Sequence, residues 1–267
     1  MSVFLAWFDQ RPGPARAAEH GLRRARFAVA AAGLTPAGYR RHDSGGADWG
    51  LAVRHAPDPG RWPVYAAGDG LTAVSLGLPV GLDTTGGALG VARRLLAGAD
   101  LAAEAVPPFG MLVHASAGCV LVAQDWLGMC RIYTATHDGV VAFGNRASLL
   151  AAFLHGAPAP DTDGWESCAA GGVFGGDTAP VRGVRLLGPA ARVRLRRTPH
   201  GWRAAWRAGR GVDNLVQAGL SRRGDPDRAV AVAADGLAAA VTAAATLCGD
   251  GLTFTWGADP HDRVVAA

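Results

Sequence analysis

The stretch that decides the fold runs from Ala123 to Leu150 and reads AQDWLGMCRIYTATHDGVVAFGNRASLL. Two β-type runs flank the pair Asp138-Gly139, which strongly favours a hairpin turn between them. The run RASLLAAFLH that starts inside this stretch predicts a short helix, with Gly156 as its end signal. Before the hairpin, Asp125 stands in the corner DWLG, where we interpret it as a turn residue. The stretch therefore predicts a corner, a hairpin and a helix, in that order.

Similar signals extend in both directions along the chain. The N-terminal run SVFLAWF reads as a buried strand, and a helix that Gly33 ends should follow it. Asp69-Gly70 predicts a second hairpin. Other predicted elements are loops with short strands in 35–63, a helix in 88–98, two strands in 109–125 and a β ribbon in 184–208 that turns at TPHG. These elements predict a β-rich first domain that ends near residue 210.

Composition excludes several classes of function. The 267 residues include no lysine, so Schiff-base chemistry cannot come from this chain. The net charge is only +4, and the arginines of the ribbon alternate with apolar residues, which favours a half-buried hairpin over a nucleic-acid groove. No run reaches the roughly 18 uninterrupted apolar residues of a membrane span, and the N-terminus lacks the pattern of an export signal. We expect a cytoplasmic protein with neither nucleic acid nor membrane as a partner.

Cysteine and histidine patterns do not predict a metal. The cysteines form no CxxC pair and have apolar flanks, so we expect buried free thiols at Cys119, Cys130, Cys168 and Cys248. The eight histidines lack a metal-binding spacing such as HExxH. His114 lies on an apolar strand and is expected to be a core histidine. We interpret four tryptophans as packing residues rather than as a partner groove: Trp49, Trp62, Trp202 and Trp206.

The last third of the chain changes character. Residues 211–224 read as a linker, and Asp225-Pro226 supplies an N-cap and a first-turn proline for a long helix. The final run, LTFTWGADPHDRVVAA, reads as a strand, a glycine turn and the start of a helix, an order that often cradles phosphate. Residues 225–267 are too few to bury a core of their own. We therefore expect an incomplete second domain.

Several segments, in order, resemble one family. MSVFLAWF is similar to the start of class-II glutamine amidotransferase domains, the N-terminal half of asparagine synthetases. AQDWLGMCRIYTATHDGVVAFGNRASLL and DTAPVRGVRLLGPAARVRL resemble later motifs of that domain, and the terminal run resembles the pyrophosphate loop that opens the synthetase domain. Relatives with this layout include β-lactam synthetases and lasso-peptide cyclases. The resemblance covers nearly the whole chain and rests on the order and spacing of its motifs.

The resemblance implies a fold and a chemistry. The fold is α+β, a four-layer αββα sandwich of the N-terminal-nucleophile hydrolase type over residues 1–210. A linker and a truncated start of an α/β adenylating domain would follow it. The parent reaction uses ATP and Mg to activate a carboxylate as an acyl-adenylate, which an amine then converts to an amide.

The departures from the family pattern concern the glutaminase site. Ser2 occupies the position of the family's N-terminal cysteine nucleophile, and a hydroxyl has a far higher pKa than a thiol. The family's oxyanion asparagine falls within 76–82, which has no side-chain donor and contains Pro79. The acid that anchors the amine of glutamine has no counterpart. We therefore expect an inactive glutaminase site.

The pyrophosphate loop also departs from the pattern. Thr255, Gly257 and Asp259 match it, whereas Trp256 replaces a glycine that lets backbone amides approach phosphate. Pro260 removes a hydroxyl and an N–H group. We expect no tight binding of ATP or Mg to this chain.

Three functions remain open at this stage. The first is the non-catalytic N-terminal part of a lasso-peptide cyclase-like amide or isopeptide ligase, acting as a scaffold and meeting a separate synthetase subunit or a precursor peptide. The second is a fragment of a glutamine-hydrolysing asparagine synthetase. The third is an N-terminal-serine hydrolase that uses Ser2, and loss of activity in Ser2→Ala together with a processed N-terminus would identify it.

Overall fold

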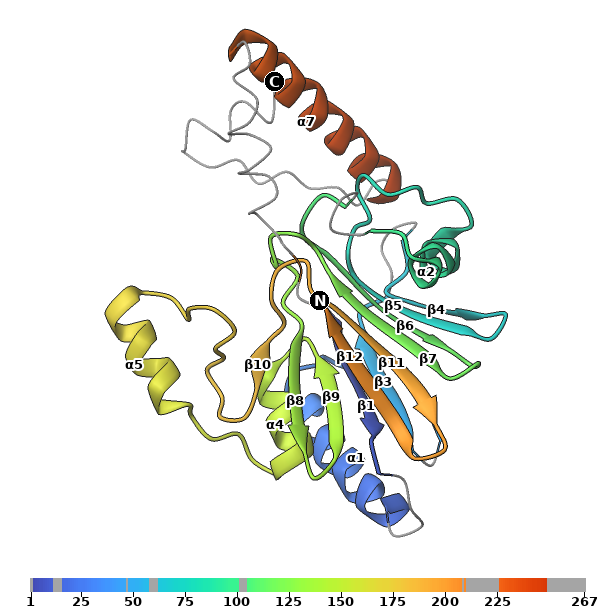
Figure 1. Cartoon of the computed structure of the whole chain (residues 1–267), viewed down its shortest axis with the longest axis vertical. Coiled ribbons are helices and arrows are strands. Elements are labelled where there is room, and N and C mark those ends of the chain that lie inside the picture. The colour runs from blue at the N-terminus through green and yellow to red at the C-terminus, as the bar shows by residue number, and fades with distance from the viewer. Residues whose placement is uncertain are drawn as a thin grey trace.

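Two six-stranded antiparallel sheets lie face to face in this computed structural model, with helices on their outer faces (Figure 1). The structure describes residues 2–11, 16–46, 48–57, 62–100, 105–207, 209 and 226–248. The predicted α+β class with stacked antiparallel sheets is confirmed.

The first sheet has the strand order β10-β8-β9-β1-β3-β2. Its strands are β1 (Ser2–Asp9), β2 (Arg40–Gly45), β3 (Trp49–His55), β8 (Tyr133–His137), β9 (Val140–Gly144) and β10 (Arg185–Leu186). The second sheet has the order β12-β11-β7-β6-β5-β4. Its strands are β4 (Tyr65–Gly68), β5 (Leu71–Gly77), β6 (Phe109–Ala115), β7 (Cys119–Gln124), β11 (Arg192–Thr198) and β12 (Gly201–Arg207).

The described helices are α1 (Arg16–Ala32), α2 (Gly87–Ala97), α4 (Ala147–His155), α5 (Thr162–Gly171) and α7 (Pro226–Cys248). Side chains of α1 and α4 pack on the outer face of the first sheet, and those of α2 pack on the outer face of the second. The order of layers is therefore helix, sheet, sheet, helix, as the resemblance implies.

Strand β1 explains why the N-terminal run is apolar at every position. Successive side chains of a strand point to opposite faces of the sheet. Phe4 and Phe8 enter the core between the sheets, whereas Leu5 and Trp7 face α1 and α4. Both faces are covered, so an unbroken apolar run replaces the alternation of a half-exposed strand.

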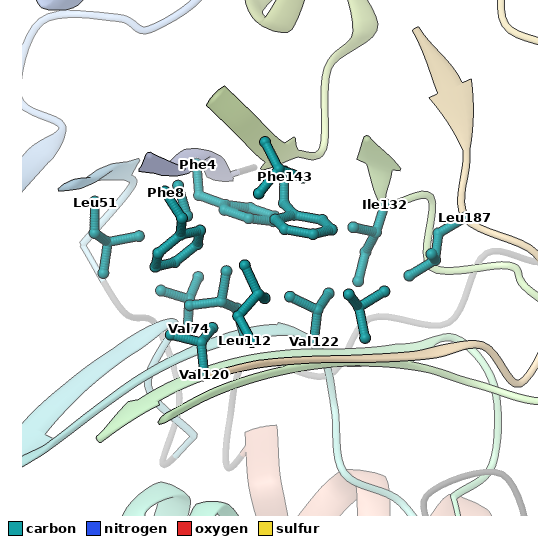
Figure 2. Packing of buried hydrophobic residues seen from close by; sticks show 14 of the residues in the cluster. Phe4, Phe8, Leu51, Val74, Leu112, Val120, Val122, Ile132, Phe143 and Leu187 are labelled. Atoms are coloured by element: carbon teal, nitrogen blue, oxygen red, sulfur yellow. The ribbon is translucent and has the colours of Figure 1, made fainter. Parts of the chain in front are cut away.

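The core between the two sheets contains residues from many segments of the chain, from Phe4 in β1 to Trp202 in β12. Figure 2 shows Phe4, Phe8 and Phe143 of the first sheet above Leu112 and Val122 of the second. Burial of one such side chain stabilises the fold by roughly 1.5–3 kcal/mol. This shared core makes the two sheets one folding unit.

Both predicted Asp-Gly hairpins are confirmed. Asp69 and Gly70 have φ of 50° and 71°, and Asp138 and Gly139 have φ of 49° and 73°. Two successive residues with positive φ form the turn whose twist matches that of paired strands, and Asp followed by Gly tolerates this conformation best.

An ion pair links the two sheets at one end. The carboxylate of Asp48, between β2 and β3, accepts two hydrogen bonds from the guanidinium of Arg197 on β11, at 2.8 and 3.0 Å. Asp48 is buried. Its main-chain oxygen also accepts a hydrogen bond from the N–H group of Asp9, at 2.7 Å. This contact fixes the end of β1 relative to the second sheet.

The short strands expected in 35–63 are present as β2 and β3, and β3 is a buried strand that pairs with β1 over seven residues. The structure also contains a helix that the sequence did not predict, α5. Gly164 is the one buried residue of this helix, so its sequence has no apolar stripe to mark it.

The predicted long helix after Pro226 is confirmed as α7, whereas the linker 211–224 and residues 249–267 lie outside the described residues. Within α7, the stretch Val230–Leu247 has a mean hydropathy of 1.7. By length and composition this stretch could cross a membrane. One such helix is weak evidence for a span, because core helices of soluble proteins meet the same criterion. Leu247 packs against residues of the second sheet and α2.

Candidate functional site

A cavity of about 520 Å³ opens where β1 begins. Ser2 lines it together with the end of β5, the segment after the DWLG corner and the start of α4. Ser2 therefore lies at a cavity, and both its place in a glutaminase site and its chemical role stay predictions.

Asn145 fixes the first residues of β1. Its Oδ1 accepts a hydrogen bond from the N–H group of Phe4, at 3.0 Å, and its Nδ2 donates to the carbonyl oxygen of Ser2, at 2.8 Å. Asn145 directly follows β9, which pairs with β1. The side-chain amide thus replaces a missing main-chain partner at the end of the β1–β9 ladder and holds Ser2 at the cavity.

Asp125 orders the DWLG corner, and Met129 and Cys130 after this corner line the cavity. Its fully buried carboxylate accepts hydrogen bonds from the main-chain N–H groups of Leu127, Met129 and Cys130, at 3.0, 3.2 and 2.9 Å. A fourth bond comes from the N–H group of Phe109, at 3.3 Å. The structural interpretation of Asp125 as a turn residue is confirmed by these contacts.

Cys130 is the thiol that lies on this cavity. Burial raises the pKa of Cys130 to about 12, and the charge of Asp125 acts in the same direction. Its Sγ donates a hydrogen bond to the carbonyl oxygen of Leu76, at 3.4 Å. Because the thiolate is the reactive form of cysteine, Cys130 is unsuited to act as a nucleophile in this cavity.

The charges on the cavity are positive. Arg131 and Arg146 line it, and none of the described lining residues is an aspartate or a glutamate. The Nε atom of Arg146 is buried without a hydrogen-bond partner among the described residues. An α-ammonium group placed here would therefore meet two arginines and no carboxylate of the described lining.

The segment expected to supply oxyanion donors does reach the cavity. Leu76 and Gly77 line it, and neither side chain can donate a hydrogen bond. Gly77 has φ of 80°, and a Cβ atom there would lie 2.0 Å from the carbonyl oxygen of Pro108. Gly77 is thus required by the close approach of two chain segments.

The other predicted site residues, Thr255, Gly257 and Asp259, lie outside the described residues. The described structure contains no part of the pyrophosphate loop or of a site for ATP and Mg, and both stay predictions. Among the described residues, no group of three or more His, Cys, Asp or Glu side chains could hold a metal ion.

Sequence reasoning assigned no role to four polar or charged residues of the cavity: Arg131, Tyr133, Asn145 and Arg146. They stand within the segment that resembles the family, but the motif gave no reason to place Asn145 in contact with Ser2. Their arrangement depends on β9 lying beside β1, which residue spacing alone does not show.

Two other predictions need correction. Cys119 and Cys168 are only half-buried, because they lie at a strand end and on α5. Trp206 is only partly packed: its ring lies 5.9 Å from that of Phe143, but its side chain is 52% exposed, since it lies near the end of an edge strand.

Trp49, Trp62 and Trp202 are packing residues and His114 is a core histidine, as predicted. His114 is buried and stacks on Trp49 with ring centroids 3.9 Å apart. Burial lowers the pKa of His114 to about 4, while the charge of Asp48 opposes this shift. His114 is therefore a neutral core histidine at physiological pH.

No family model and no curated protein sequence matches this chain. Similar solved structures include glutamine phosphoribosylpyrophosphate amidotransferase from B. subtilis complexed with ADP and GMP, at 10% identity and a TM-score of 0.35 over 77% of this chain. Another is described as the allosteric regulatory enzyme of purine biosynthesis, at 10% identity and a TM-score of 0.37 over 77% of this chain. The chain spans about half the length of each, 49% and 48%. Likenesses of this size do not by themselves assign a family or an activity.

Proposed function

We propose that residues 2–207 form a glutamine amidotransferase-like domain of the N-terminal-nucleophile type that no longer hydrolyses glutamine. The observation that carries this proposal is the cavity at Ser2, whose described lining offers no carboxylate, and whose one thiol is buried with a raised pKa. The domain would act as a scaffold within an ATP-dependent amide ligase of the asparagine synthetase type.

The geometry supports the first half of the proposal. Ser2 is the first residue of β1, which lies between β9 and β3 in the middle of the first sheet, and it lines a cavity of about 520 Å³. In N-terminal-nucleophile chemistry the hydroxyl or thiol of the first residue attacks, and its own α-amine is the base. A residue at this position is the one that such chemistry would use.

The same cavity argues against turnover of glutamine. A serine hydroxyl has to be activated by a base, a developing oxyanion needs donors, and the substrate amine needs an acid. The described lining residues include no acid, and the segment at Leu76 and Gly77 brings no side-chain donor. Two arginines favour an anionic group over a zwitterionic amino acid.

The ligase half of the proposal rests on the order of the sequence motifs. An amide ligase without its own glutaminase takes the amine from the substrate itself, as in the closure of a lasso-peptide ring. The adenylating residues would then belong to a separate synthetase subunit. The domain would contribute a docking surface for that subunit or for a precursor peptide.

Ammonia release from glutamine tests the proposal. We expect none from the full chain, and none from Ser2→Cys, because a thiol restores the nucleophile without restoring the carboxylate that would hold the amine of glutamine. Near-ultraviolet circular dichroism of both proteins controls for folding. Ammonia release that Ser2→Ala abolishes would contradict the proposal and support a glutamine-hydrolysing synthetase fragment.

A second candidate is a self-standing hydrolase that uses Ser2. It is favoured by one contact, the hydrogen bond from Asn145 that fixes the carbonyl of Ser2 at the cavity. This candidate requires that Met1 is removed, because the free α-amine of Ser2 would act as the base. Intact mass spectrometry shows whether Met1 is retained. Ser148→Ala is the matched control for Ser2→Ala, because Ser148 lines the same cavity on α4 and is exposed.

A further inference from the structure

Strand β12 is an edge of the second sheet, and among the described residues its one neighbouring strand is β11 (Figure 1). An edge strand presents main-chain N–H and C=O groups that no other strand uses. A cavity of about 620 Å³ lies at this edge and shares no lining residue with the cavity at Ser2. An inference about the edge is therefore independent of the proposed function.

The hydrogen bonds of β11 show which main-chain groups of β12 are already used. The N–H group of Arg197 donates to the carbonyl oxygen of Gly118, and the carbonyl oxygen of Ala191 accepts from the N–H group of Gln124. The odd-numbered residues of β11 therefore bond toward β7. Successive residues of an antiparallel strand bond to opposite neighbours, so the even-numbered residues of β11 bond to β12.

The free groups of β12 follow from this register. The residues of β12 opposite the even-numbered residues of β11 are Gly201, Arg203, Ala205 and Arg207. The residues between them, Trp202, Ala204 and Trp206, turn their N–H and C=O groups to the open edge. Three donor and acceptor pairs in a row are thus available to a further antiparallel strand.

The side chains of β12 differ between its two faces. Trp206 faces the first sheet, where its ring centre lies 5.9 Å from that of Phe143. Because side chains alternate along a strand, Arg203 and Arg207 point to the outer face of the second sheet. Both are exposed, and neither forms an ion pair with a described residue. Acidic side chains on the outer face of an added strand would meet these two charges.

The face between the sheets has room for apolar side chains at this edge. Thr134 and Thr136 of β8 pair with residues of β9 that belong to the core between the sheets, so both face the second sheet. Thr136 is exposed, which shows that the second sheet leaves this part of β8 uncovered. Both threonines line the cavity together with the apolar side chains of Trp206 and Leu187. The inward side chains of a strand added to β12 would enter this cavity.

The charge of the edge argues against a second copy of this chain as the partner. Pairing β12 with its counterpart would bring two further arginines to the face that carries Arg203 and Arg207. Like charges on neighbouring strands destabilise a sheet, and charged residues on edge strands disfavour such pairing. The same charges favour an acidic partner.

We propose that β12 binds an extended peptide segment in which acidic and apolar residues alternate, as one more strand of the second sheet. The added strand is antiparallel, like every other pair in this sheet. Its apolar residues lie opposite Ala204 and Trp206 and enter the cavity, whereas its acidic residues lie beside Arg203 and Arg207.

Fluorescence anisotropy of a labelled peptide EVELEVE, titrated with the full chain, tests the proposal. We expect saturable binding of this peptide and none of KVKLKVK, whose charges are reversed. No saturable binding of EVELEVE would overturn the proposal.

Methylation of the peptide main chain separates strand pairing from general attraction to a cationic surface. In the proposed pairing the N–H groups of the three apolar residues point at β12, whereas those of the glutamates point away from it. N-methylation of the apolar residues should therefore abolish binding. N-methylation of three glutamates is the matched control and should leave most of the affinity. Equal losses from the two modified peptides would overturn the proposal.

Variants of the chain place the binding at β12. Ala204→Pro removes a free N–H group at the open edge, where proline is tolerated, and should weaken binding about tenfold, the upper range for one hydrogen bond. Arg207→Gln should weaken it about threefold, the size of one exposed ion pair. Arg41→Gln removes the same charge from β2, an edge of the first sheet, and should leave the affinity unchanged.

Circular dichroism shows whether each variant folds, and Arg207→Gln keeps the test usable if Ala204→Pro does not. Equal affinity of Arg207→Gln, Arg41→Gln and the unaltered chain would overturn the proposal. A dimer in analytical ultracentrifugation that Ala204→Pro dissociates would also overturn it, because a second copy would then occupy the edge.

Discussion

The side-chain amide of Asn145 donates a hydrogen bond of 2.8 Å to the carbonyl oxygen of Ser2, 143 residues earlier in the chain. The same amide accepts a bond from the N–H group of Phe4. One side chain from the end of β9 therefore fixes the start of the central strand and the position of Ser2 at its cavity.

Asn145→Ala should lower the free energy of unfolding by about 1–3 kcal/mol, because the N–H group of Phe4 would be left buried without an acceptor. Urea unfolding followed by tryptophan fluorescence measures the loss. Ser148→Ala changes an exposed residue of the same cavity and should be nearly neutral. If the two variants have equal stabilities, the contact does not anchor the strand.

Asp125→Ala should be more damaging than Asn145→Ala. Four main-chain N–H groups lose their acceptor, so we expect a loss of at least about 3 kcal/mol in the free energy of unfolding. Asp177→Ala is the control, since the Asp177–Arg185 ion pair is exposed. Such an exposed pair contributes little to stability, because water and salt screen it. Similar losses in both variants would refute the role of the corner.

Gly50→Ala should destabilise the first sheet by about 1–3 kcal/mol or prevent folding, because its methyl group would overlap the ring of Trp7. Gly171→Ala meets no atom within 4 Å and is the matched control. Its effect should stay below about 1 kcal/mol. Thermal unfolding by circular dichroism measures both, and a stable Gly50→Ala would disprove the close packing of indole on β3.

The buried ring of His114 should make the protein less stable in acid. Burial lowers the pKa of His114 to about 4 from the usual 6.5. Between these pH values the unfolded chain binds a proton that the folded chain does not, so this contribution to stability falls as the pH falls. The whole effect is at most about 3 kcal/mol.

His114→Phe removes the titrating group and keeps a ring against Trp49. The difference in unfolding free energy between pH 7 and pH 4.5 should therefore shrink in this variant. Urea unfolding at the two pH values measures it, and an unchanged difference would place the acid sensitivity elsewhere.

Cys130 should resist alkylation in the folded protein. Burial raises the pKa of its thiol to about 12, so almost none of it is thiolate at pH 8. Iodoacetamide at pH 8, followed by peptide mass spectrometry, should label the half-buried Cys119 and Cys168 before Cys130. Urea should remove the difference. Early labelling of Cys130 in native protein would contradict its protected state.

The sequence by itself determined the elements and their kind. Asp-Gly pairs at 69–70 and 138–139 predict hairpins because only a few residues tolerate the positive φ that such turns require. The run from Val3 to Phe8 predicts a buried strand, since every residue in it is apolar. Such signals are local, so spacing and composition contain them.

Only the tertiary structure decided which distant residues meet. Asn145 reaches Ser2 because β9 pairs with β1, and Asp48 reaches Arg197 because the sheets stack. Pairing and stacking join segments more than 100 residues apart through contacts that no local pattern records, and the cavity at Ser2 exists only once those contacts have formed.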